Sequence, residues 1–163
     1  MTPTLGLRHA VLWVRDPHAS ARFYEAALGL VVKQTLDGAV FMTSPASATD
    51  HDLALFQARD PQPPQPGRIG LYHLAWEVGT LDELRDAAER LADLGAVVGS
   101  ADHGVSRSIY ARDPDGIEFE VMWEVPTELL DDQTAGLEPL DLAADLDRFG
   151  GQRPGRGVAD PTD

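Results

Sequence analysis

The side chains most able to do chemistry in this sequence are histidines and carboxylates, because the chain has five histidines and no cysteine. The absence of cysteine excludes disulfides, thiolate metal sites and a cysteine nucleophile, so a bound metal would have to use His, Asp, Glu or water. Two of the histidines, His9 and His73, stand in similar apolar segments, at residues 7–14 and 70–78. The histidines are therefore the residues to follow.

A third candidate, Glu120, stands in a hairpin pattern. Polar and apolar residues alternate over 102–110 and 117–123, and Asp-Pro-Asp-Gly at 113–116 marks a tight turn. The alternation places Glu118 and Glu120 on one face of the second strand. A carboxylate among such apolar neighbours faces inward only if a metal, a proton or a cation compensates it. The alternative is an exposed face that carries both glutamates.

The first half of the chain reads as a β-α-β-β-β module over about residues 5–58. The segment 7–14 is a predicted strand in which His9, Val11 and Trp13 share a face. Asp16 and Pro17 are typical of a helix start and Gly29 of its end. Three further strands are predicted at 30–36, 39–43 and 53–57.

The same order recurs over residues 69–125, after a proline-rich linker at 59–68. A strand at 70–78 precedes a helix that opens on a capping box from Thr80 to Glu83, and the hairpin follows. His9 and His73 hold the same place in the two copies, which indicates an internal duplication. We expect an α+β fold in which two tandem β-α-β-β-β modules form one curved, cup-shaped mixed sheet flanked by helices, within one domain over 1–125.

The remaining residues, 126–163, form a predicted C-terminal extension. Leucines spaced among acids before residue 150 favour a short helix or strap that packs on the domain or on a partner subunit. The glycine-rich and arginine-rich end from about residue 150 predicts disorder. The unpaired sheet edges and the apolar strap together suggest a homodimer.

Charge and length narrow the function classes. The 163 residues suit one domain or two small fused modules, and a net charge of −14 argues against nucleic acid or an anionic membrane as a partner. There is no apolar run long enough to span a membrane and no signal-peptide pattern at Met1, which predicts a soluble cytoplasmic protein.

The repeat and its motifs resemble the vicinal oxygen chelate superfamily, which includes glyoxalase I, bleomycin-resistance proteins and extradiol ring-cleaving dioxygenases. The resemblance covers residues 5–125. It is closest to small catechol 2,3-dioxygenase-like proteins, because Asp-His-Gly-Val-Ser-Arg-Ser-Ile-Tyr at 102–110 is followed by Asp-Pro-Asp-Gly and a strand-borne glutamate. Pro-Leu-Asp-Leu at 139–142 also looks like a feature of that group.

The resemblance implies that His9, His73 and Glu120 are metal ligands. Two imidazoles and one carboxylate leave the other coordination positions of an iron open, as oxygenases that use Fe(II) require for substrate and O₂. The implied cofactor is Fe(II), with Mn(II) as the alternative. Glyoxalase-like sites use a fourth protein ligand, and the position that answers Glu120 in the first module falls in the apolar stretch 53–56.

The resemblance also implies three catalytic residues. His51 matches a histidine that moves protons, Tyr110 a hydrogen-bonding tyrosine, and His103 a histidine close to the site. For His103 the open alternative is a loop histidine that caps the turn at Gly104. Trp13 is the aromatic candidate for the substrate pocket, because it shares a strand face with His9.

These residues favour an extradiol dioxygenase that cleaves a small catechol-type aromatic substrate with O₂ at a metal centre. A metal-free small-molecule binder of the drug-resistance type and a glyoxalase-like metal-dependent lyase or isomerase are the alternatives. A binder has no need of three inward-facing ligands.

Overall fold

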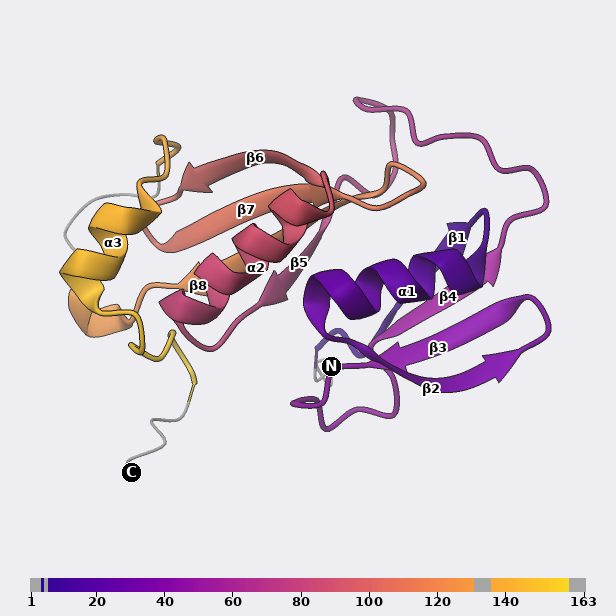
Figure 1. Ribbon diagram of the computed structural model, residues 1–163, viewed down its shortest axis with the longest axis horizontal. Coiled ribbons are helices and arrows are strands. Elements are labelled where there is room, and N and C mark those ends of the chain that lie inside the picture. Colours follow the sequence, from indigo (N-terminus) through magenta and orange to yellow (C-terminus); the bar gives the residue numbers. More distant parts are fainter. Residues whose placement is uncertain (1–3, 5, 131–135, 159–163) are drawn as a thin grey trace. The chain divides into compact units, whose positions relative to one another are not determined.

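The computed structural model describes residues 4, 6–130 and 136–158. Its chain divides into two compact units (Figure 1). The first consists of residues 1–64 together with the turn 113–116, and the second consists of the remaining residues. Each unit contains one four-stranded sheet.

The first unit is built as β-α-β-β-β. Its elements are β1 (Ala10–Val14), α1 (Pro17–Leu28), β2 (Val31–Leu36), β3 (Ala39–Thr43) and β4 (Leu53–Gln57). The strand order is β1-β4-β3-β2, with β1 parallel to β4 and the other neighbours antiparallel. The Asp16 side chain accepts hydrogen bonds from two backbone N–H groups of the first turn of α1, and Gly29 ends this helix in the left-handed conformation, as predicted.

One face of the first sheet packs against α1 (Figure 1). The residues buried there alternate along the strands, as one face of a sheet requires. They are Leu12, Val14, Val40, Met42, Leu53 and Leu55, facing Ala21, Tyr24 and Ala27 of the helix.

The second unit repeats this arrangement. Its elements are β5 (Leu74–Glu77), α2 (Leu81–Asp93), β6 (Val97–Asp102), β7 (Ser106–Arg112) and β8 (Glu118–Glu124), followed by a 3₁₀ turn (Thr127–Leu129) and α3 (Leu142–Phe149). The strand order is β5-β8-β7-β6, with β5 parallel to β8. The Thr80–Glu83 capping box begins α2, whose apolar stripe is buried.

The predicted α+β class and duplication are confirmed, whereas the single sheet is not. Among the described residues the strands are joined by hydrogen bonds into two four-stranded sheets. Both first strands are also shorter than predicted: β1 begins at Ala10 and β5 at Leu74, so His9 and His73 lie one residue before them. The apolar pattern continues into these preceding residues, which is why periodicity placed the strand starts too early.

Equivalent positions in the two units follow from strand register. In β1 and β4, Val11 pairs with Ala54. In β5 and β8, Ala75 pairs with Glu120. Since His9 and His73 stand two residues before Val11 and Ala75, Ala54 holds in the first unit the place that Glu120 holds in the second.

The C-terminal extension contains the predicted short helix, α3, which packs on α2 of its own unit, one of the two expected alternatives. Part of the extension, 131–135, lies outside the described residues. Residues 150–158, expected to be disordered, make backbone hydrogen bonds from Gly155 to Gly79 and from Arg156 to Glu124. Local composition could not reveal these long-range partners. The final residues, 159–163, also lie outside the described range.

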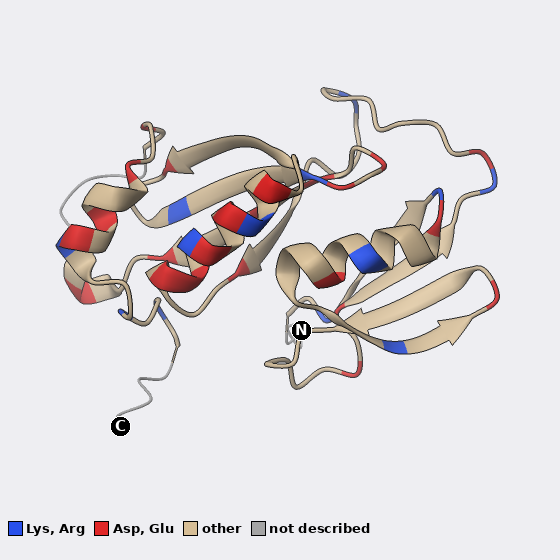
Figure 2. Ribbon diagram, in the orientation of Figure 1, with Lys and Arg blue, Asp and Glu red and all other residues tan. Residues whose placement is uncertain are grey.

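Acidic residues outnumber basic ones, 27 to 13, and both kinds stand along α2. On α2, for example, Arg85 pairs with Asp82 and Asp86 (Figure 2). None of the described helices has the length and apolar character that crossing a membrane requires.

Candidate metal and catalytic site

Two of the three predicted metal ligands, His73 and Glu120, lie in contact in the second unit. The His73 Nε2 atom is 3.1 Å from the Glu120 Oε2 atom. Strand β5 runs parallel to β8, and Leu74 pairs with Phe119. His73 is the residue before Leu74 and Glu120 is the residue after Phe119, so this pairing brings the two side chains close together. Glu120 is only 7% exposed, so this carboxylate faces inward.

The alternative that the glutamates of this strand face solvent fits Glu118 better than Glu120. Glu118 is half-buried and pairs with the Arg112 guanidinium at 3.1 Å. Glu120 instead has an imidazole as its partner. One strand therefore carries a carboxylate in an ordinary surface ion pair and, two residues later, a carboxylate buried against a histidine.

The His73 and Glu120 side chains fit a divalent cation as donors. Two ligands bound at about 2.1 Å and at right angles lie roughly 3 Å apart, close to the separation of this nitrogen and this oxygen. Imidazole and carboxylate are ligands that Fe(II) and Mn(II) accept. The Nδ1 atom of His73 is buried and has no hydrogen-bond partner among the described residues.

The third predicted ligand, His9, lies in the first unit beside His51. Their ring centroids are 4.5 Å apart. His51 also contacts the edge of the Phe41 ring and places its Nδ1 atom 3.0 Å from a carboxylate oxygen of Asp50. The structure thus brings together, in one unit, a predicted ligand and a predicted proton-transfer residue.

Asp50 links this histidine pair to a lysine. Hydrogen bonds from Lys33 and then from His51 lower the pKa of the Asp50 carboxyl to about 2. The carboxylate is therefore ionised at neutral pH and favours a proton on His51 Nδ1. Sequence reasoning missed Asp50, although its place next to His51 was a usable signal.

An aromatic cluster continues from His51 across the face of the first sheet that is opposite α1. Phe41 meets Phe56 at 5.8 Å between ring centroids, and Phe56 meets Trp13 at 5.9 Å. Trp13, the predicted pocket residue, is 68% exposed. Phe41 and Phe56 were not predicted to share this face, although the period of two along β3 and β4 could have placed them there.

Tyr110 and His103 are hydrogen bonded in the second unit. The His103 Nε2 atom is 2.7 Å from the Tyr110 hydroxyl, and Tyr110 pairs directly with Glu120 across β7 and β8. Burial, and next the negative charge of Glu120, raise the pKa of Tyr110 to about 12. The phenol is therefore protonated at neutral pH.

The alternative role for His103, capping the turn at Gly104, belongs to another residue. The Gly104 backbone N–H donates to the Asp102 carboxylate at 2.6 Å. Both nitrogen atoms of the His103 ring have other partners: Nε2 contacts the Tyr110 hydroxyl and Nδ1 contacts the Gly136 carbonyl.

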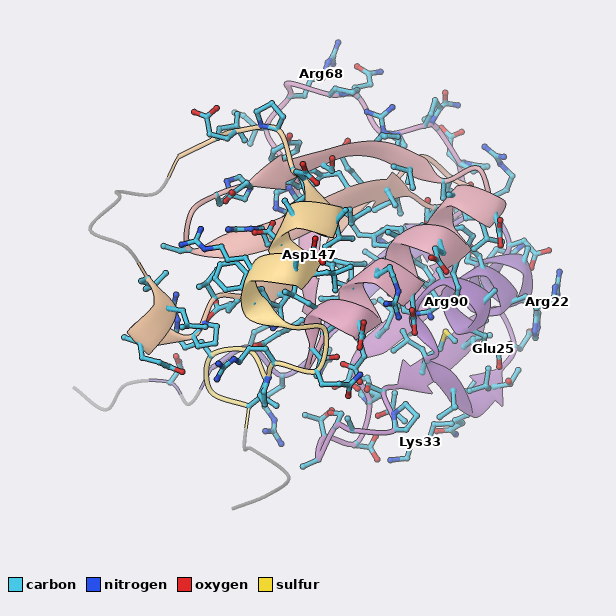
Figure 3. The ribbon with its side chains drawn as sticks, turned by 60° about the vertical axis from the view of Figure 1, so that its left-hand side comes forward. Arg22, Glu25, Lys33, Arg68, Arg90 and Asp147 are labelled. Carbon is cyan, nitrogen blue, oxygen red and sulfur yellow. The ribbon has the colours of Figure 1, made fainter. Side chains whose placement is uncertain are left out.

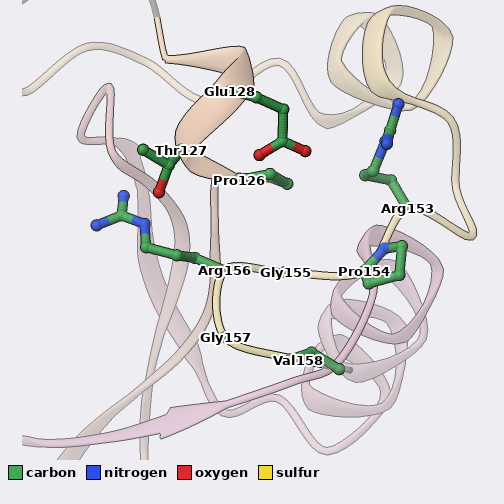
Figure 4. Close-up of a pocket in the computed structure, with 9 residues that line it drawn as sticks. All are labelled: Pro126, Thr127, Glu128, Arg153, Pro154, Gly155, Arg156, Gly157 and Val158. Atoms are coloured by element: carbon green, nitrogen blue, oxygen red, sulfur yellow. The ribbon is translucent and has the colours of Figure 1, made fainter. Parts of the chain in front are cut away.

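Within either unit, over its described residues, no three His, Asp or Glu side chains gather closely enough to hold a metal. A pocket of about 240 Å³ lies in the second unit, between residues 126–128 and 153–158 (Figure 4). It contains none of the predicted site residues.

Comparisons with known proteins identify the family of this chain. A family model described as the Glyoxalase/Bleomycin resistance protein/Dioxygenase superfamily matches residues 6–121. The catechol-2,3-dioxygenase of Bacillus subtilis (strain 168) is 31% identical over 121 residues, which are 72% of this chain and 41% of that protein. The biphenyl-2,3-diol 1,2-dioxygenase 3 of Rhodococcus globerulus is 34% identical over 124 residues, covering 74% and 64%. The chain thus spans less than two thirds of the length of either relative.

Solved structures show the same fold. A glyoxylase/bleomycin resistance protein/dioxygenase domain from Frankia sp. EAN1pec has a TM-score of 0.61 at 26% identity and covers 75% of this chain and 99% of that one. A lactoylglutathione lyase from Agrobacterium tumefaciens has a TM-score of 0.57 at 26% identity, covering 74% and 95%. The fold is therefore shared by relatives with different named activities.

Proposed function

This chain belongs to the glyoxalase/bleomycin resistance protein/dioxygenase superfamily, and we propose that it is a metal-dependent extradiol dioxygenase that cleaves a catechol-type aromatic ring with O₂. The observation that carries the proposal is the buried contact between His73 and Glu120. An inward carboxylate without a compensating charge costs several kcal/mol, so a protein with no use for a cation gains nothing by keeping it there. The named activities of the two curated relatives support the same class.

The ligand set that we propose is His9, His73 and Glu120. The two histidines stand at equivalent places before β1 and β5, which a duplicated metal-binding fold explains. When bound, Fe(II) supplies adjacent open positions at which a catechol and O₂ meet. Mn(II) takes the same ligands and is the alternative metal.

The first unit distinguishes this proposal from a glyoxalase-like lyase or isomerase. A fourth protein ligand would stand at Ala54, which occupies the place equivalent to Glu120. Ala54 is a buried methyl group and offers no donor atom. Three protein ligands leave one more position for substrate and O₂ than four do, which favours the dioxygenase.

The chain's own residues supply the proton chemistry in this proposal. His51 exchanges the catechol protons, since an imidazole titrates near neutral pH and the ionised Asp50 orients its ring. Tyr110 and His103 hold a hydrogen bond beside the oxygen atoms of the substrate. The aromatic cluster of Trp13, Phe41 and Phe56 suits the flat face of an aromatic substrate.

A metal-free binder of small molecules is the second candidate. Its support is the exposed aromatic cluster, which by itself would suffice to bind an apolar ligand. The inward Glu120 counts against it, because that carboxylate would then serve no purpose. Metal dependence of ligand binding separates the two candidates.

The test combines metal loading with turnover. Chain stripped of metal is reloaded with Fe(II) without oxygen, and a panel of catechols is then screened in air for the yellow ring-opened product. We expect about one Fe(II) per chain and cleavage of at least one catechol. Stoichiometric iron binding without cleavage of any catechol would overturn the dioxygenase, and absence of metal binding would favour the binder.

The matched variants are Glu120→Gln and Glu118→Gln, which remove the same charge two residues apart on β8. We expect Glu120→Gln to weaken iron binding by about tenfold or more, because a metal ligand loses its charge. Glu118→Gln should bind iron as the parent does, since Glu118 pairs with Arg112 instead. Equal iron affinity in the two variants would show that Glu120 is not a ligand.

A further inference from the structure

The C-terminal extension contacts the hydrogen-bonded pair of His103 and Tyr110. We propose that residues 136–149, here called the C-terminal strap, position catalytic side chains of the site. The strap fixes the orientation of the His103 ring and, through this ring, that of the Tyr110 hydroxyl. The inference rests on the proposed function for the role of Tyr110. All of its contacts lie within the second unit.

The first attachment of the strap is at the loop after β6. Asp102 and Glu138 exchange two backbone hydrogen bonds of 2.9 Å, as neighbouring antiparallel strands do. Next to them the Gly136 N–H donates to the His103 carbonyl at 3.1 Å. The Gly136 carbonyl lies 3.2 Å from His103 Nδ1. The strap therefore holds both the backbone and the ring of His103.

The second attachment is a buried ion pair between β7 and α3. The Arg107 guanidinium donates to both oxygens of Asp145, at 2.7 and 3.1 Å, and to Asp102 at 2.6 Å. Arg107 is 3% exposed and Asp145 7%. The Phe149 ring also lies below this guanidinium, 5.5 Å from centroid to Cζ. Arg107 thus ties the strap to the same residue, Asp102, that precedes His103.

The contact with the Gly136 carbonyl determines which nitrogen of the neutral His103 ring carries the proton. A carbonyl oxygen only accepts hydrogen bonds, so Nδ1 must carry a proton to donate to Gly136. In the neutral ring Nε2 is then an acceptor. The single proton of the Tyr110 hydroxyl has two candidate acceptors, His103 Nε2 at 2.7 Å and the Glu120 carboxylate, and a ring protonated on Nδ1 draws it to His103. The strap therefore sets the direction of the hydrogen bond made by Tyr110.

The direction of the Tyr110–His103 hydrogen bond matters because of where Tyr110 lies. Tyr110 pairs with Glu120 across the β7–β8 ladder, and its hydroxyl lies within hydrogen-bonding reach of the carboxylate of this proposed metal ligand. A hydroxyl whose proton points to His103 presents its lone pairs elsewhere, ready to accept from a substrate hydroxyl. Residues far along the chain, Gly136 and Asp145, are therefore positioning residues for the reaction.

The variant that tests the strap is Asp145→Asn, and its matched control is Asp147→Asn. Both remove one negative charge from α3, but Asp145 is buried against Arg107 and Asp147 is exposed (Figure 3). We expect Asp145→Asn to lower kcat by about tenfold to a hundredfold, with KM and iron content close to those of the parent. Asp147→Asn should retain the kcat of the parent.

A double-mutant cycle separates positioning from general loosening. Once Tyr110→Phe has removed the hydroxyl, adding Asp145→Asn should change kcat by no more than about twofold, because the strap then has nothing to position. If the two losses multiply in full, the strap acts only on stability and the proposal is wrong.

A second readout needs neither activity nor a variant that folds well. Nitrogen NMR of the imidazole rings in the metal-free full-length parent, with His103 assigned from the spectrum of His103→Gln, should show a proton on Nδ1 and none on Nε2 at alkaline pH. A neutral ring protonated on Nε2 would overturn the proposal. This result stands apart from the dioxygenase test: if no catechol is cleaved, the proposed function fails, while the tautomer still decides whether the strap fixes His103.

Discussion

At the scale of single residues, His51 combines a proposed catalytic role with several packing contacts. Its ring touches His9 and Phe41, and its Nδ1 atom faces Asp50. Changing His51 to Phe keeps the ring contacts and removes the proton carrier. We expect iron binding and catechol binding to persist, while kcat falls by about 10² to 10⁴ as general acid–base assistance is lost.

The measurement is single-turnover cleavage by the iron-loaded variant under air. The matched control is His18→Phe, a histidine near the start of α1 and exposed, which should cleave at the rate of the parent. A His51→Phe variant as fast as the parent would mean that the catechol protons leave by another path, such as His103 or water.

The resemblance of the sequence to a known superfamily implied that His73 and Glu120 are metal ligands, and the structure places these two side chains in contact. Their metal binding stays a prediction. The Gly136 carbonyl could not be predicted in the same way, because any residue has a carbonyl and only folding brings residue 136 to residue 103. Asp145 appeared in the sequence as one acid among many, and its burial depends on Arg107 in a strand 38 residues earlier.

At the scale of elements, Tyr24 of α1 shows how a turn is held. Its hydroxyl donates to a carboxylate oxygen of Asp113 at 3.1 Å, within the first unit. Burial, and next the charge of Asp113, raise the pKa of Tyr24 well above the usual phenol value. Above about pH 10 the unfolded chain therefore loses this proton while the folded chain keeps it. Stability should be full below pH 10 and should fall as the pH rises further, up to the higher pKa of the folded chain.

Changing Tyr24 to Phe isolates this contribution. Near pH 8 the variant should be about 1 kcal/mol less stable, because a buried hydrogen bond is lost. Above pH 10 the difference should shrink, since the variant has no phenol to ionise on unfolding. Urea unfolding between pH 8 and 11 measures it, with Tyr72→Phe at an exposed tyrosine as the control. A constant difference across this range would contradict the assigned cause.

Element types were predictable wherever local chemistry decides them. Asp16 and Gly29 bound α1, and the Thr80–Glu83 box begins α2, because caps satisfy the free backbone groups at helix ends. Strand ends were less predictable, since they depend on pairing with partners distant in sequence. The order of residues 150–158 was missed for the same reason, as their hydrogen bonds reach back to Gly79 and Glu124.

At the scale of the whole molecule, the edge of the first sheet bears on assembly. Among the described strands β2 has a neighbour on one side only, and all six of its residues are exposed. They include Val31, Val32 and Leu36, an unusual set for a strand edge that meets only water. The strap was expected to pack either on the domain or on a partner subunit, and α3 packs on its own unit. The sheet edge is therefore the better basis for the predicted homodimer.

We expect sedimentation equilibrium at micromolar concentration to give about twice the chain mass of 17.6 kDa. Each chain has a net charge of −14, so two chains repel and added salt should strengthen association by screening. Val32→Lys should weaken the dimer because it places a charge on the edge strand, whereas Ile69→Lys, at an exposed residue just after the linker, should leave it intact. A parent that sediments only at 17.6 kDa at every salt concentration would rule the homodimer out.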